Sequence, residues 1–173
     1  MDHGMEAHAL SDGISEGFLH LKNERFVAAF NEMFEPLAEL ERLALLESAR
    51  HDTHADGDVI MHQGSKNQAI YVLVHGELQI VQEVGGNNTE IAHLGVGAVF
   101  GEMSFTDLEG ASASVIATGD VEVLYMDGSQ INNLFATIAG FESRFFRSLS
   151  IILSRRLRVT NTRLCWKLWS GEI

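Results

Sequence analysis

The sequence predicts a mainly β domain with helices at both ends, and three observations lead to this class. The chain has 173 residues, is 46% hydrophobic and contains one proline, which fits a single globular domain with a sizeable core. Apolar residues recur at helical spacing over residues 26–46 and again after residue 129. Between about 54 and 127 the period changes to short extended runs separated by glycine and Asx residues. That pattern is typical of an antiparallel β barrel or jelly roll.

The N-terminal part of the chain is expected to be an extension followed by a helical pair. Residues 1–25 open with a polar, acidic stretch and are assigned to the extension. The folded domain is expected over 26–165, with 166–173 as a tail. Pro36 is expected to divide the two helices, because proline interrupts a helix. The apolar face of this pair is formed by Phe26, Phe30, Met33, Phe34, Leu37, Leu40, Leu43 and Leu46.

The barrel is expected over about 54–127, built from short strands joined by tight turns. Gly85-Gly86-Asn87-Asn88 has the chemistry of a hairpin tip, and His75-Gly76-Glu77 is predicted to be another turn. The predicted strands are Tyr71–Val74, Leu78–Val81, Glu90–Leu94, Ser114–Ala117 and Val121–Tyr125.

The C-terminal part, residues 129–165, is expected to be helical and to contain a long helix from about Phe141 to Leu164. Its apolar stripe is close to heptad spacing. Such a stripe has to pack on the barrel, on a second copy of itself, or on both, and we expect a homodimer through residues 141–164. The stripe contains Phe146, Leu149, Leu153, Leu157 and Leu164.

Charge and composition exclude several classes of function. The net charge is −12, yet the stretch from residue 141 carries +5, so residues 1–140 carry −17. A chain this acidic is a poor binder of DNA or of an anionic membrane. Cys165 is the single cysteine, which excludes a disulfide framework and fits a cytoplasmic protein. The chain has no signal peptide pattern and no apolar stretch approaching roughly 18 residues.

No pattern in the chain indicates an enzyme or a resident metal or cofactor. Serine, histidine and carboxylate residues are present, but none belongs to a recognisable nucleophile or acid–base motif. His51-x-x-His54, with His62 nearby, has donor atoms but no fixed geometry, so we expect no metal there.

Three segments together resemble the cyclic nucleotide-binding domain family: Gly57–Gly64, Tyr71–Leu78 and Leu94–Phe105. The resemblance extends from about Leu40 to Leu164, and the glycines fall at the turns of the family. It implies a cupin-like β jelly roll flanked by helices, with the ligand in a cassette spanning Phe100–Val115. The resemblance also implies that Glu102 accepts a hydrogen bond from the ribose hydroxyl of the ligand and that Phe105–Asp107 forms a short helix.

The cassette departs from the family at one position. The family places an arginine nine residues after the glutamate, and that position is Ala111 here, within Gly110-Ala111-Ser112-Ala113-Ser114. A charge-assisted hydrogen bond contributes roughly 1.5–3 kcal/mol, so losing a bidentate pair weakens phosphate binding by about two to four orders of magnitude unless another group replaces it. Ser112, Ser114 and the amides near Ala111 remain as neutral donors.

The long helix resembles that of the catabolite activator proteins, in which adjacent polar residues meet the purine. Thr160 and Asn161 fall on those positions, and Arg156 or Arg158 is the candidate to replace the missing arginine. The resemblance therefore implies cyclic AMP or cyclic GMP as candidate ligands. The predicted ligand-binding residues are Phe100, Gly101, Glu102, Met103, Ser104, Ala111, Ser112, Ala113, Thr160 and Asn161.

The sequence leaves three hypotheses. The first is a stand-alone ligand-sensing regulatory module that signals through its C-terminal helix to an effector protein the sequence does not identify. The second is a degenerate module that binds no nucleotide and serves as an interaction or dimerisation domain. The third, a transcription regulator, is weaker, because only nine residues follow Leu164 and a helix-turn-helix needs more.

Overall fold

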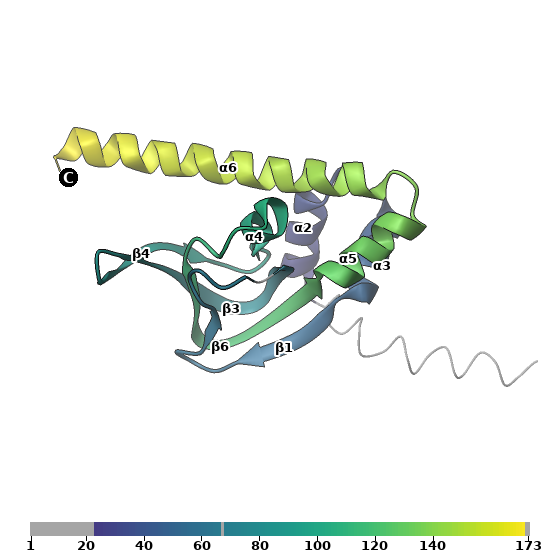
Figure 1. Ribbon diagram of the computed structural model, residues 1–173, viewed down its shortest axis with the longest axis horizontal. Coiled ribbons are helices and arrows are strands. Elements are labelled where there is room, and N and C mark those ends of the chain that lie inside the picture. The colour runs from purple at the N-terminus through teal and green to yellow at the C-terminus, as the bar shows by residue number, and fades with distance from the viewer. Residues whose placement is uncertain (1–22, 67, 172–173) are drawn as a thin grey trace, which may run out of the picture.

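The computed structural model describes residues 23–66 and 68–171, so most of the expected extension over 1–25 lies outside the described residues. Helices precede and follow a run of strands, and α6 extends along one side of the molecule (Figure 1). In chain order the elements are α2 (Glu24–Met33), α3 (Glu39–Ser48), β1 (Arg50–His54), β2 (Val59–Met61), β3 (Ala69–Val84), β4 (Asn87–Leu94), β5 (Val99–Phe100), α4 (Glu102–Asp107), β6 (Ser114–Asp127), α5 (Gly128–Thr137) and α6 (Phe141–Ser170).

The strands form one antiparallel sheet in the order β1-β6-β3-β4, with β2 on β6 and β5 on β3. The mainly β jelly roll with N-terminal helices and a long C-terminal helix is therefore confirmed. Pro36 lies between α2 and α3, as expected, and Gly85-Gly86 is the turn that joins β3 to β4.

The predicted turn at His75-Gly76-Glu77 is wrong, because β3 runs through it without a break. The register against β6 shifts on both sides of His75, which marks a bulge instead of a reversal. Gly76 has φ +86, and a Cβ there would lie 2.5 Å from the carbonyl oxygen of Asp120. The glycine therefore serves close packing of two long strands and does not reverse the chain.

Two further elements differ from the expectation. β1 is a strand of five residues that pairs with β6, whereas the sequence places the start of the barrel at about residue 54. β6 is also continuous from Ser114 to Asp127, so the two strands predicted there are one.

The core has two parts, one on each side of the sheet. The first lies between the sheet and the helices and is rich in phenylalanine; the second fills the inside of the jelly roll. Phenylalanine rings from α6 meet those of α2 and of the residue that follows it in the first part: Phe34, directly after α2, and Phe145 have ring centroids 6.2 Å apart. The fully buried rings are Phe26, Phe30, Phe34, Phe141 and Phe145.

Helix α6 divides into a packed part and an exposed part. Its first three turns place Phe141, Phe145, Leu149 and Ile152 in the core of the same chain. Beyond Leu153 every residue except Arg156 is exposed, and this end extends past the neighbouring helices (Figure 1). The large apolar residues of α6 that remain exposed, among them Leu157, Val159 and Leu164, therefore all lie after Ile152.

Helix α6 is longer than the helix expected from Phe141 to about Leu164, because it continues to Ser170 and includes the first residues of the expected tail. Trp166 and Trp169 lie on this end, with ring centroids 5.3 Å apart, and both are exposed. The chain does not bury its tryptophans on its own barrel.

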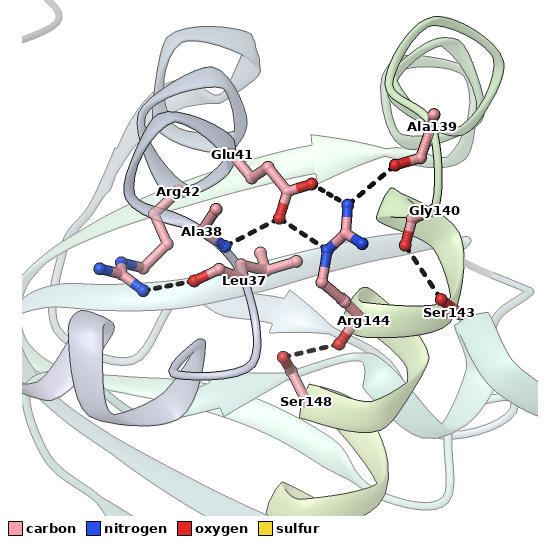
Figure 2. A network of polar contacts seen from close by, with 9 residues as sticks. All are labelled: Leu37, Ala38, Glu41, Arg42, Ala139, Gly140, Ser143, Arg144 and Ser148. Carbon is pink, nitrogen blue, oxygen red and sulfur yellow. Dashed lines mark hydrogen bonds and ion pairs between the residues drawn. The ribbon is translucent and has the colours of Figure 1, made fainter.

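An ion pair anchors the start of α6 to α3. Arg144 Nε donates to Glu41 Oε2 at 2.9 Å, and a second guanidinium nitrogen donates to Glu41 Oε1 (Figure 2). The same carboxylate accepts the backbone N–H of Ala38 at 2.8 Å, and Arg144 also donates to the carbonyl of Ala139 at 2.9 Å. The hydrogen bond from Arg144 lowers the pKa of Glu41 below its usual value.

Candidate ligand cavity between the cassette and the long helix

A cavity of about 710 Å³ lies between the inner face of the jelly roll and α6. This volume is within the range of sites that bind small molecules. Strands β3 and β4, the cassette and the middle of α6 all contribute to it. The lining residues are Met61, Ile80, Ile91, Ala92, His93, Leu94, Phe100, Gly101, Glu102, Met103, Ser104, Ala111, Ser112, Ala113, Val115, Leu153, Arg155, Arg156, Leu157, Val159, Thr160 and Arg163.

Close backbone packing shapes the cassette, the segment Phe100–Val115. α4 runs from Glu102 to Asp107, three residues longer at its start than the helix implied by the resemblance. A Cβ on Gly110 would lie 2.7 Å from the carbonyl oxygen of Gly64, so only glycine fits there without a shift of the backbone. Gly64 N–H donates to the carbonyl of Ala111 at 2.8 Å, which fixes the loop against the turn after β2.

Glu102 is the central charged group of the cassette side. It is 1% exposed, and its carboxylate accepts a hydrogen bond from the guanidinium of Arg156 on α6. The same guanidinium also donates to the carbonyl of Val99. A buried carboxylate requires such a partner, since an unpaired buried charge is costly. Arg156 therefore links α6 to both β5 and the start of α4.

Nine of the ten predicted site residues line the cavity. They are Phe100, Gly101, Glu102, Met103, Ser104, Ala111, Ser112, Ala113 and Thr160. Asn161 is exposed on α6 and does not belong to the described residues that line the cavity. Of the two arginines considered as replacements, Arg156 lines it, and Arg158 does not.

One of the neutral donors expected around Ala111, the N–H of Ala111 itself, is already occupied. Ala111 N–H donates to the carbonyl of Ser65 at 3.0 Å. The Ser114 hydroxyl accepts the N–H of Gln63 at 2.9 Å, and the Ser112 hydroxyl lies 3.6 Å from the sulfur of Met103. The hydroxyls of Ser112 and Ser114 can still donate to an anion, because Ser114 acts only as an acceptor and a contact of Ser112 with sulfur is weak.

The sequence reasoning missed the apolar wall and one arginine. The wall comes from β3 and β4, where Ile80, Ile91 and Leu94 face the cavity. Arg163 follows Arg156 by seven residues, which is about two helical turns and places both on one face with Thr160 between them. That spacing is the signal in the sequence that could have indicated Arg163.

A second contact joins α4 to α6. The ring of Phe105 lies 6.0 Å from that of Phe145 and 6.2 Å from that of Phe146, between centroids. The cassette helix is therefore fixed to α6 by an ion pair at its first residue and by aromatic packing at its fourth.

The described part of the chain contains neither a cluster of metal-ligating side chains nor a membrane-spanning helix. In residues 23–66 and 68–171, no group of three or more histidine, cysteine, aspartate and glutamate side chains is placed to hold a metal ion. None of the helices within the same ranges combines the length and hydropathy needed to cross a bilayer.

The family profile for the cyclic nucleotide-binding domain matches residues 52–138, half of the chain. The chain belongs to the cyclic nucleotide-binding domain family. It is 30% identical over 133 residues to the cyclic AMP receptor protein of Thermus thermophilus, which covers 76% of this chain and 60% of that protein. It is 25% identical over 136 residues to the cAMP-dependent protein kinase type II regulatory subunit of Drosophila melanogaster, covering 76% of this chain and 36% of that protein.

A solved structure shows the same fold. The cyclic nucleotide-binding domain from Methylobacillus flagellatus superposes with a TM-score of 0.74 at 19% identity, over 84% of this chain and 85% of that one. The chain spans about three fifths or less of the length of the two proteins named above. These similarities therefore establish the domain family of the chain and not a complete activity.

Proposed function

We propose that this domain is a ligand-sensing regulatory module: its cavity receives a cyclic nucleotide or a related small molecule, and α6 reports whether the cavity is occupied. The observation that carries the proposal is the contact of Arg156 with Glu102 and the Val99 carbonyl. Glu102 occupies the position of the family's ribose-binding glutamate, so a ligand hydroxyl would compete for the carboxylate that holds α6.

The coupling follows from the rigid attachment of α4. A ligand that shifts Glu102 changes the partner of Arg156, and the packing of Phe105 against Phe145 carries any tilt of α4 to the same helix. A ligand shifts the equilibrium between two positions of α6 only by the difference between its affinities for them. The proposal therefore requires contacts with the ligand that differ between the two states.

The output of the module is proposed to be a homodimer interface on the exposed part of α6. Leu157 and Leu164 follow the stripe of Leu153 at near-heptad spacing, and both are exposed in the single chain. Sedimentation of the full chain and of a Leu157→Glu, Leu164→Glu variant tests this. A dimer for the first and a monomer for the second is expected; a monomer for both contradicts the interface.

A second function has a specific observation in its favour: the module binds no cyclic nucleotide and serves interaction alone. Ala111 replaces the family arginine, and its N–H is already bonded to the carbonyl of Ser65. Without a replacement cation, the phosphate would lie against neutral and apolar groups.

Calorimetric titration with cyclic AMP and cyclic GMP separates the two functions. Binding, together with altered hydrogen exchange in residues 157–170, is expected from the sensor. Ala111→Arg should tighten the affinity by one or more orders of magnitude, because it restores a charge-assisted contact. Ala111→Gln, which adds bulk without charge, is the matched control. Absence of heat with both nucleotides in the native chain and in Ala111→Arg rejects the cyclic nucleotide as ligand.

A further inference from the structure

The charged groups of the cavity are distributed unevenly between its two walls. Three arginines line it, Arg155, Arg156 and Arg163, and all three come from α6. Among the described residues that line the cavity, Glu102 is the one carboxylate. Three positive groups against one negative group favour an anionic ligand, even though the chain as a whole carries −12.

The three arginines differ in how far they are already neutralised. Arg156 is paired with buried Glu102, and Arg155 donates to Glu32 at 3.1 Å. Arg163 makes no hydrogen bond or ion pair within residues 23–66 and 68–171. Its guanidinium is thus the cation that remains available to an incoming anion, about 10 Å along the helix from Arg156.

The opposite wall has a different character. The cassette contains no lysine or arginine, and the N–H of Ala111 is already donated to Ser65. Around it the inner surface is apolar, with Met61, Ile80 and Ile91 among the side chains that face the cavity. A polar group placed against this wall would lose its hydrogen bonds to water without replacement, which is unfavourable.

We propose that the cavity binds an amphipathic anion, with one acidic group held by Arg163 on α6 and an apolar body against β3, β4 and the cassette. This inference rests on the proposed function, because it assumes that the cavity is the sensing site, and it names the chemical class of the ligand. The acidic group would lie on the helix side of the cavity, opposite to the position that the family's arginine would give a phosphate. Such a ligand places its acidic group against the arginine side of the cavity and its apolar body against the apolar side.

Two fluorescent probes that differ in one group test the proposal. 8-Anilinonaphthalene-1-sulfonate has an aromatic body and a sulfonate, and N-phenyl-1-naphthylamine has the same body without the charge. The full chain is titrated with each probe, and dodecanoate and cyclic AMP are then added as competitors. Sulfonate binding at one site per chain, displaced by dodecanoate, is the expected result.

The variants locate the acidic group. Arg163→Gln should weaken the sulfonate probe about three- to tenfold and leave the uncharged probe unchanged, because it removes one exposed charge-assisted contact. Arg158→Gln is the matched control: it removes the same charge from the same helix at a position that does not line the cavity. The affinity of Arg158→Gln for both probes should equal that of the native chain. High salt should reduce the difference between native and Arg163→Gln proteins.

Four results overturn the proposal. If Arg158→Gln weakens binding of the sulfonate probe as much as Arg163→Gln does, the probe senses only the general charge of the helix. If dodecanoate does not displace the probe, the probe is bound elsewhere, for example on the exposed end of α6. If cyclic AMP binds but neither the sulfonate probe nor dodecanoate competes with it, the ligand class is wrong while the sensor function stands. If no probe and no nucleotide binds, the inference and the sensor function both fail.

Discussion

Replacing Arg156 with methionine should destabilise the domain, because the substitution leaves the carboxylate of Glu102 buried without its cation. The methionine retains much of the apolar length of the side chain but removes the hydrogen bonds to Glu102 and to the Val99 carbonyl. Removing one partner of a fully buried ion pair costs about 3–5 kcal/mol. The Arg156 side chain is 36% exposed, so solvent screens the pair, and we expect a loss of about 2 kcal/mol.

A loss of this size is measurable for a chain of 173 residues. At this size 1 kcal/mol corresponds to a change in Tm of about 2–4 °C, so Arg156→Met should lower Tm by about 4–8 °C. Urea unfolding followed by circular dichroism gives the free energy of unfolding directly, provided that the m value stays constant. Arg158→Met is the control and should change the free energy by less than about 0.5 kcal/mol, because Arg158 is exposed.

A double-mutant cycle with Glu102→Gln isolates the pair. Once Glu102 is neutral, removal of the arginine charge should cost much less, so the coupling energy should be about 1–2 kcal/mol. A loss below about 0.5 kcal/mol for Arg156→Met, or additive effects in the cycle, would refute the reasoning that this ion pair holds α6 to the cassette.

Two further predictions concern stability elsewhere in the domain. The pKa of Glu41 is lowered in the folded state, so its ion pair contributes fully above about pH 4.5, its ordinary value, and is lost as the pH falls through the lower folded value. Glu41→Gln should therefore reduce the free energy of unfolding by about 1–2 kcal/mol at pH 7 and by less at pH 3, measured by urea unfolding at both; an equal loss at both contradicts it. Leu108 is exposed with φ +61, a backbone conformation that L residues adopt at a cost of about 1–2 kcal/mol. Leu108→Gly should raise the stability by about 1 kcal/mol, whereas Leu108→Ala, which keeps the Cβ, should not; equal Tm values for the two variants would show that the conformation carries no strain.

Local patterns were enough to predict the mainly β class, because alternation and turn residues act over a few positions. They failed where a glycine serves packing between strands. Gly76 resembles a turn residue in sequence, yet its lack of a Cβ is required by the carbonyl of Asp120, which lies 44 residues away in the chain. β1 was missed for another reason: Arg50–His54 is polar, and four of its five residues are exposed, so it has no apolar alternation to detect.

The candidate site was also predictable where it depends on one local segment and not where it depends on contacts between distant residues. The cassette follows from one continuous segment, and the residues predicted there do line the cavity. The pairing of Arg156 with Glu102 joins residues 54 positions apart, and the choice between Arg156 and Arg158 depends on the rotation of α6 against the barrel. That rotation is set by the burial of Phe145, Leu149 and Ile152, which the stripe alone could not distinguish from packing on a second chain.

The exposed end of α6 makes this domain unusually convenient to observe. The chain has two tryptophans, Trp166 and Trp169, and one cysteine, Cys165, and all three lie on the surface of these last turns. Intrinsic tryptophan emission therefore reports on the environment of the helix end and is insensitive to the phenylalanine core. A thiol-reactive dye on Cys165 would label the same turn uniquely. Optical signals from this chain thus follow the element proposed to move.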